Sequence, residues 1–254
     1  MFKFSTCALS LLLILGINIA SLAEITDDMI VAAWLFDGDA KDISKNGYHG
    51  ELQGGKFVAG KFGQALELNG SSEWVAINQK MGSFEELTFA HWLNCTGRDG
   101  QWRTFFNNNG WKGGDVHYQL HQDNRVEFSI NNPGDNDRFA TYRVTGGELN
   151  KWTHIATVYS GKEGKVRFCI DGELNIELDW GNNLAVLDVA QIGAWKNNAG
   201  NQERHMQGLF DEFAIFNTVL SQDEINSLKD SGLEGGLAVD PKKKLTVTWG
   251  SLKK

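Results

Sequence analysis

The sequence predicts an all-β fold in which two antiparallel sheets stack face to face and one short C-terminal helix closes the domain. Two observations predict it. Apolar residues occur in short alternating runs separated by Gly, Asn and Asp, and the chain has 29 Gly but only two Pro. A chain of 254 residues lies in the size range of a single β-sandwich domain.

The first 23 residues predict a cleavable signal peptide. Lys3 precedes an apolar run over residues 8–20, and Ser21-Leu22-Ala23 places small residues at both positions that signal peptidase reads. The apolar run is shorter than the roughly 20 residues that a membrane-spanning helix needs. A retained anchor is the alternative. We expect cleavage after Ala23, an extracytoplasmic location and no membrane insertion of the mature chain.

The strands are expected wherever the period-two pattern occurs. The runs are 30–36, 65–68, 74–77, 87–93, 104–107, 116–121, 126–130, 139–144, 152–159, 166–170, 174–178, 189–192 and 208–216. Asp171-Gly172 separates two of these runs, and this dipeptide supplies the positive φ angles of a tight turn, so the flanking strands should form a hairpin.

The single helix is expected to begin at Ser221, whose hydroxyl can cap a free N–H while Glu224 reaches back, and to stop at Gly232. The β-domain then spans 24–236. Residues 237–254 form a basic tail, either solvated or used for docking.

Charge and cysteine content exclude several classes of function. The formal net charge of −8 disfavours nucleic acid and anionic membranes as partners. Only Cys95 and Cys169 remain after signal removal, and neither lies in a metal-binding spacing. Both fall in strand-like runs, which favours buried free thiols over a disulfide.

Several motifs follow one another in an order that can be compared with known families. They are Trp34-Leu-Phe-Asp37, the loop 42–50, the Gly-rich segment 60–70, 88–92, 152–158, 168–172 and 208–225. Together they resemble the laminin-G-like jelly-roll family, a subset of the concanavalin A-like lectin and glucanase superfamily. Lys45 and Cys169 depart from the family pattern, where Gly and Tyr are usual. The resemblance implies a two-sheet antiparallel jelly-roll sandwich whose first and last strands are neighbours.

Three tryptophans fall within strand alternations. We interpret Trp34, Trp92 and Trp152 as core residues between the two sheets, with a role as ligand platforms as the alternative.

Two acids predict a calcium site. Asp211 shares strand parity with Phe213 and Ile215, and Asp37 continues the parity of Val31 and Leu35, so both carboxylates should point inward and need neutralisation. The resemblance implies a structural Ca²⁺ here, held by Asp37, Asp211 and the carbonyl of Gly70. Alternatively, the carboxylates accept backbone N–H groups from the Gly-rich loops.

Aromatic and amide side chains concentrate between residues 98 and 142 and return near 195–204. Sugars present C–H patches that stack on aromatic rings and hydroxyls that amides and Arg bind. The predicted ligand residues are Trp102, Asn107, Trp111, His117, Tyr118, Trp195 and Arg204. In the competing interpretation, Trp102, His117 and Tyr118 pack inward and the Asn clusters are turns.

The sequence favours a binding module over an enzyme. Laminarinase-type glucanases, which share this fold, need a Glu-x-Asp-x-x-Glu arrangement, and the segment starting at Glu177 has Asn182 in place of the second Glu. We therefore predict an exported adhesion or binding module for a polysaccharide or an extracellular protein. The alternatives are an envelope component docked by its tail and a hydrolase with an unrecognised site.

Overall fold

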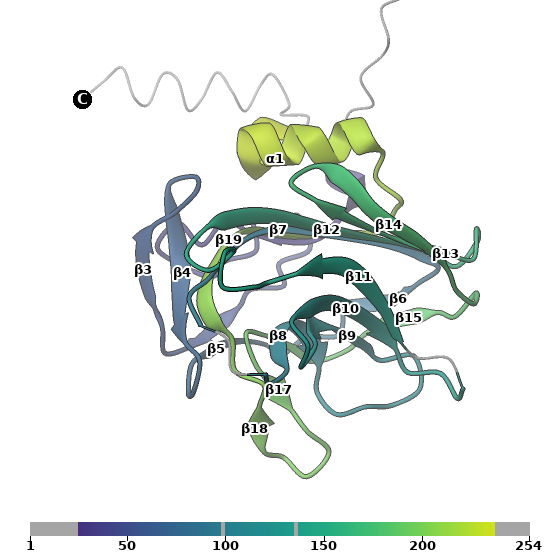
Figure 1. Ribbon diagram of the computed structural model, residues 1–254, viewed down its shortest axis with the longest axis horizontal. Helices are drawn as coiled ribbons and strands as arrows, with labels where there is room; N and C mark the ends of the chain where they lie inside the picture. Colours follow the sequence, from purple (N-terminus) through teal and green to yellow (C-terminus); the bar gives the residue numbers. More distant parts are fainter. Residues whose placement is uncertain (1–24, 98–99, 135–136, 237–254) are drawn as a thin grey trace, which may run out of the picture.

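A computed structural model describes residues 25–97, 100–134 and 137–236. The predicted signal peptide and basic tail lie outside the described residues. The two-sheet sandwich with one C-terminal helix is confirmed (Figure 1). A short 3₁₀ turn, η1 (Asp27–Met29), leads into the first strand.

One sheet, which we call the helix-side sheet, has the order β14-β13-β12-β7-β19-β4-β3, with β1 paired to β19. The expectation that the first and last strands are neighbours is thus confirmed. Its strands are β1 (Ile30–Trp34), β3 (Lys56–Ala59), β4 (Gln64–Asn69), β7 (Glu86–Cys95), β12 (Trp152–Ser160), β13 (Lys165–Ile170), β14 (Glu173–Asp179) and β19 (Gln207–Phe216).

The other, the cleft-side sheet, has the order β11-β10-β9-β8-β16-β5-β2. Its strands are β2 (Glu51–Gln53), β5 (Trp74–Ile77), β8 (Arg103–Asn108), β9 (Val116–Leu120), β10 (Arg125–Ile130), β11 (Asp137–Arg143) and β16 (Ala190–Ile192). Two small ribbons complete the fold: β6 (Gly82–Phe84) with β15 (Ala185–Leu187), and β17 (Trp195–Lys196) with β18 (Gln202–Glu203). In Figure 1 the β17–β18 hairpin projects away from the sandwich beside β8.

An aromatic cluster joins the two sheets. Phe89 of β7 is fully buried, and its ring centroid lies 5.6, 5.2 and 5.8 Å from those of Phe106, Tyr118 and Phe128 on the facing sheet. Such tilted ring pairs stabilise a fold beyond the area they bury. This cluster is the centre of the inter-sheet core.

The helix α1 (Gln222–Gly236) packs on the outer face of the helix-side sheet. The predicted capping box is present: the Ser221 N–H and hydroxyl both donate to Oε2 of Glu224, 2.7 and 2.8 Å away. Gly232 interrupts the helical dihedral angles with a φ of 67°, at the predicted stop. Ile225, Leu228 and Leu233 cover the alanines of the central strands.

The register corrects one sequence prediction. Trp34 lies in the core, but Trp92 and Trp152 do not. Trp92 pairs with His154, and Trp152 with Asn94, on the same face as Ala90, which packs under α1. Paired residues share a face of the sheet, so both indoles point outward.

The cysteines are free, as predicted. Cys95 belongs to the inter-sheet core, whereas Cys169 packs under α1, so the two thiols lie on opposite faces of one sheet.

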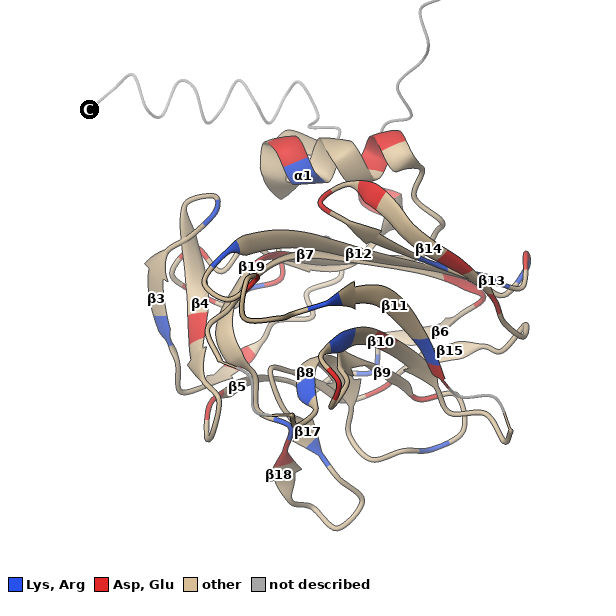
Figure 2. Cartoon of the chain, in the orientation of Figure 1, with Lys and Arg blue, Asp and Glu red and all other residues tan. Residues whose placement is uncertain are grey.

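Within the described part of the chain, no helix is long and apolar enough to cross a membrane. In Figure 2, Lys and Arg (blue) and Asp and Glu (red) are interspersed over the strands, the loops and the helix.

Truncation of Phe89 tests the core. Phe89→Ala should lower the free energy of unfolding by about 3–5 kcal/mol, because it removes ring contacts with three residues and leaves a cavity. The measurement is urea unfolding. Leu174→Ala, at a side chain that is 54% exposed, is the matched control and should change stability by no more than about 0.5 kcal/mol. Equal losses in the two variants would contradict this core.

Candidate functional site

A cleft of about 320 Å³ opens on the outer face of the cleft-side sheet. We call it the tryptophan cleft. Its lining is Trp102, Trp111, His117, Gln119, Glu127, Ser129, Asp137, Trp195, Asn198 and Arg204. The strand alternation accounts for its floor: Tyr118 and Phe128 point into the core, so Gln119 and Glu127, which pair across β9 and β10, point outward.

Arg204 occupies the centre of the cleft wall. Its guanidinium carbon lies 4.9 Å from the ring centroid of Trp102 and 4.1 Å from that of Trp195, in two cation–π contacts. Its Nη1 donates to Oε1 of Gln119 at 2.9 Å. Within the described residues it forms no ion pair, and its Nε and Nη2 make no hydrogen bond. The guanidinium is therefore held in place, and its Nε and Nη2 donors remain available to a ligand.

Burial lowers the pKa of Arg204 from its ordinary value. A guanidinium nevertheless stays protonated at all physiological pH values, so the cleft wall carries a fixed positive charge.

His117 supports the aromatic side of the cleft. Its ring lies 4.2 Å from that of Trp111 and 5.2 Å from that of Trp195. Burial, and then the charge of Arg204, lower the pKa of His117 to about 3. The neutral ring donates from Nε2 to the carbonyl of Gly110 at 3.1 Å, a tautomer assigned because a carbonyl can only accept.

Gly110 is the point where these loops converge. Its carbonyl also accepts from Nε1 of Trp195 at 3.0 Å. Its φ is 78°, and a Cβ at this position would lie 2.6 Å from Oδ1 of Asn198, which accepts from the Trp111 N–H at 3.1 Å. Only glycine allows this close approach.

Glu127 connects the floor to Trp102. Its Oε1 accepts from Gln119 at 2.9 Å and from Ser129 at 2.8 Å, and its Oε2 accepts from Nε1 of Trp102 at 3.2 Å. Burial raises the pKa of Glu127. Both carboxylate oxygens are thus engaged in positioning neighbours.

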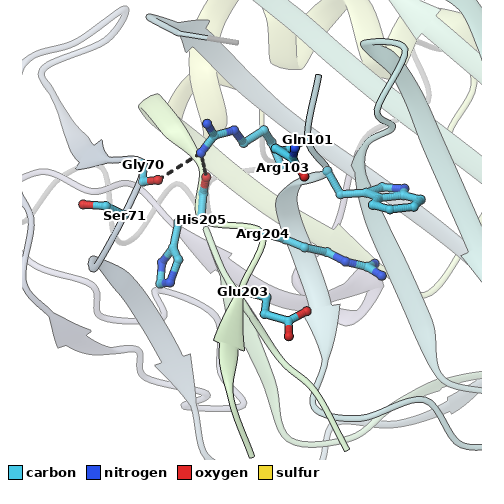
Figure 3. A pocket seen from close by; sticks show the side chains of 8 residues that line it. Gly70, Ser71, Gln101, Arg103, Glu203, Arg204 and His205 are labelled. Atoms are coloured by element: carbon cyan, nitrogen blue, oxygen red, sulfur yellow. Dashed lines mark hydrogen bonds between the residues drawn. The ribbon is translucent and has the colours of Figure 1, made fainter. Parts of the chain in front are cut away.

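A second depression, of about 530 Å³, adjoins the cleft and shares Trp102 and Arg204 with it. Figure 3 shows its lining, in which Arg103 reaches toward Gly70 while Arg204 extends the other way. Nη1 of Arg103 donates to the carbonyls of Gly70, at 3.0 Å, and His205. The two depressions adjoin at the Trp102–Arg204 contact, because both are lined by these two residues.

The structure gathers five of the seven predicted ligand residues at the cleft: Trp102, Trp111, His117, Trp195 and Arg204. Asn107 lies behind its floor, where Nδ2 donates to Gln119 at 2.9 Å. Tyr118 points into the core, and its hydroxyl lies 3.2 Å from Nε2 of His91. Sequence reasoning missed Gln119, Glu127, Ser129 and Asp137, although the alternation of polar and apolar residues in β9 and β10 was a usable signal.

The predicted calcium residues do not all meet. Oδ2 of Asp211 accepts from the Lys61 and Phe62 N–H groups at 2.7 and 2.9 Å, and Oδ1 of Asp37 accepts from the Gln64 N–H at 2.5 Å. Both acids therefore hold the loop between β3 and β4. Gly70 is not beside them: the preceding Asn69 pairs with Gln207, the first residue of β19, four positions along the strand from Asp211.

The inward orientation predicted for the acids is wrong. A bulge at Glu212, where φ is 54°, shifts the register between Asp211 and Ala214, so Phe213 faces the core while Asp211 lies opposite the outward Trp92. Asp37 follows Phe36, another residue with positive φ, and is exposed. Bulges break the parity on which the prediction depended.

Burial, reinforced by the nearby Asp37, raises the pKa of Asp211 to about 6. Burial and the charges of Asp211 and Asp37 raise the pKa of Glu212 to about 7. In the described residues, the buried Oδ1 of Asp211 has no hydrogen-bond partner. Asp211 and Glu212 therefore hold their protons more tightly than free carboxyl groups do.

The raised pKa of Asp211 predicts a pH-dependent stability difference. The stability that protonated Asp211 contributes is fully present below pH 3.8, the pKa of the carboxyl group in the unfolded chain. This stability is lost as the pH rises through about 6, the pKa in the folded protein. Asp211→Asn should therefore gain up to about 2 kcal/mol relative to wild type between pH 4 and pH 8. Urea unfolding of both proteins in EDTA measures this difference in the free energy of unfolding. The buried histidines have an opposing pH effect, but it is the same in both proteins and therefore cancels. A difference that does not change with pH would contradict the prediction.

Comparison with known proteins identifies the family. The model of the concanavalin A-like lectin/glucanases superfamily matches residues 69–226, more than half of the chain. A search of the curated proteins finds no match.

One similar solved structure is domain 4 of AbnA, a GH43 extracellular arabinanase from Geobacillus stearothermophilus, in complex with arabinotriose. Its sequence is 18% identical to this chain, and the TM-score is 0.57. The alignment covers 79% of this chain and 98% of that domain. The ligand-binding domain of botulinum neurotoxin serotype D in complex with N-acetylneuraminic acid is 15% identical with a TM-score of 0.61, over 80% of this chain and 51% of that domain. The binding domain of Paraclostridial Mosquitocidal Protein 1 is 17% identical with a TM-score of 0.59, and the alignment covers 81% of this chain and 52% of that domain.

This chain thus spans about half the length of the toxin domains. At these identities the likeness shows the fold alone. The family match and the sandwich agree with the resemblance noted in the sequence, and the chain belongs to the concanavalin A-like lectin/glucanases superfamily.

Proposed function

We propose that the protein is an exported, non-catalytic module that binds carbohydrate along the groove formed by the tryptophan cleft and the depression beside it. The observation that carries the proposal is the Arg204 guanidinium, fixed between Trp102 and Trp195 with free donors. A preorganised cation with aromatic neighbours suits a ligand that has both C–H faces and hydroxyl or carboxylate oxygens.

Trp111 is the stacking platform in this proposal. The inner faces of Trp102 and Trp195 are occupied by Arg204, whereas Trp111 leans on His117 and is only partly buried. Asp137 and Asn198, which also line the cleft, supply polar contacts for sugar hydroxyls. The groove extends past Trp102 into the second depression, which favours an oligosaccharide chain over a single sugar.

The placement of the acids supports binding rather than catalysis. Glu177 and Asp179, nearest to the glucanase motif, lie on the edge strand β14 and pair with Arg167 at 2.6 Å and Lys165 at 2.5 Å. Glu127 is near Asp137 in the cleft, but its two oxygens accept three hydrogen bonds from the protein. A general acid or nucleophile needs an oxygen that faces substrate.

Two similar structures were solved with saccharides, arabinotriose in the arabinanase domain and N-acetylneuraminic acid in the toxin domain. These complexes, together with the apolar N-terminal run, support a saccharide partner outside the cytoplasm. A cleft of about 320 Å³ lined by aromatic side chains also favours a glycan over a protein surface.

Binding to a glycan array tests the proposal. Trp111→Ala and Trp195→Ala should each weaken binding of the best-retained saccharide by about thirtyfold, as expected when a central aromatic contact is removed. Leu174→Ala, an exposed apolar residue on the other sheet, is the control and should bind as wild type does. Undiminished binding by both tryptophan variants would refute the cleft as the site.

Calcium at Asp37 and Asp211 is a further part of the proposal. The unpartnered Oδ1 of Asp211 and the raised pKa values of Asp211 and Glu212 fit a site that a cation would neutralise. The carbonyl of Gly70 does not fit, because Arg103 binds it.

Calcium titration at pH 8 should raise the melting temperature of the wild type and leave that of Asp211→Asn unchanged. At a hundredfold excess over Kd the gain corresponds to about 3 kcal/mol. A wild-type melting temperature that does not respond to millimolar calcium would exclude the metal.

A further inference from the structure

A separate pocket, of about 560 Å³, lies on the opposite face of the sandwich, outside the helix-side sheet. We call it the outer-face pocket. Its lining is Lys61, Phe62, Trp92, Trp152, Asp171, Lys229 and Asp230. It lies beside α1, which contributes Lys229 and Asp230 and whose apolar residues cover the neighbouring part of the same face (Figure 1).

The pocket contains two indoles that the core does not use. Trp92 packs edge-on against Phe62 and His154, at 6.4 and 5.4 Å between ring centroids. Its Nε1 is buried and has no acceptor among the described residues. Trp152, at the start of β12, is partly exposed, and its indole makes no hydrogen bond within the described part of the chain.

Two of the charged groups around the indoles, Lys61 and Asp171, form no ion pair within the described residues. Nζ of Lys229 pairs with Asp230 at 2.9 Å, and Oδ1 of Asp171 accepts from the His154 N–H at 2.9 Å. Lys61 has no ion pair in the described residues, and its Nζ lies 4.3 Å above the ring of Trp92. His154 is neutral, because burial lowers its pKa to about 3.

Asp171 is engaged by a backbone N–H, whereas the donors of this pocket that lack an acceptor among the described residues are the Lys61 ammonium and the indole N–H groups of Trp92 and Trp152. A ligand that satisfies them brings acceptors, at least one of them anionic, on a ring whose C–H face can lie on an indole. We infer that the outer-face pocket binds an acidic sugar residue, a pyranose that carries a carboxylate or a sulfate.

In this assignment the sugar ring lies on Trp152 and its anionic group pairs with Lys61. The Trp92 indole N–H, which has no acceptor among the described residues, donates to a second ligand oxygen. The site is independent of the tryptophan cleft, since the two lie on opposite faces of the sandwich.

The test is a titration of the ¹⁵N-labelled protein, followed through the indole N–H signals of Trp92 and Trp152. Glucuronic acid and glucose 6-sulfate are the anionic probes, and glucose is their neutral counterpart. Both indole signals should shift with at least one anionic probe in the millimolar range, and glucose should bind about tenfold more weakly or worse, the contribution of one charge-assisted hydrogen bond. Tighter binding of glucuronic acid would indicate a carboxylate ligand, and tighter binding of glucose 6-sulfate would indicate a sulfate.

Lys61→Met keeps the length of the side chain and should weaken binding of the anionic probe about tenfold. Trp111→Ala, in the tryptophan cleft, should leave the titration of the outer-face pocket unchanged. The proposal for the cleft and the inference about the pocket can therefore fail separately. The inference is overturned if neither indole signal shifts with either anionic probe, if glucose shifts them equally, or if Lys61→Met binds as tightly as wild type.

Discussion

The contact of Phe89 with Phe106, Tyr118 and Phe128 determines much of the rest of this molecule. It ties the central strand of one sheet to three strands of the other and so fixes which side chains of each strand face inward. Because successive residues of a strand alternate between faces, the neighbours of these core aromatics must point outward. His117, Gln119 and Glu127 reach the floor of the tryptophan cleft for this reason.

The sequence predicted the long strands, the Asp171-Gly172 hairpin and the Ser221–Glu224 cap, because each depends on a local pattern. It missed short strands such as β2, β3 and β17, which contain too few residues to establish a period. Five cleft residues were identified by composition alone.

The errors have a common physical cause. Side chains alternate between the two faces only along an uninterrupted strand. The positive φ at Glu212 interrupts β19 beside Asp211, and a register shift interrupts β1 before Asp37. Trp92 and Trp152 sit on the face covered only in part by α1, and no local pattern tells that face from the core. The interaction of Arg103 with Gly70 joins residues 33 apart, which spacing alone does not reveal.

The two outer faces of the sandwich differ in chemistry. On the cleft-side sheet, buried polar groups are connected into one network from Ser129 through Glu127 and Gln119 to Arg204, and this network holds the tryptophans in place. On the helix-side sheet, Nε1 of Trp92 has no acceptor among the described residues and Lys61 lies over the same indole. In the two proposals made above, the two faces bind different parts of a polysaccharide.

In the function proposed for this protein, the tryptophan cleft is the main carbohydrate site. A crystal structure of the protein with the saccharide that it retains most strongly on an array is the decisive measurement. We expect a sugar ring against Trp111 with an oxygen bound by the free donors of Arg204. A saccharide bound elsewhere, with Arg204 still enclosed and the cleft empty of ligand, would contradict it.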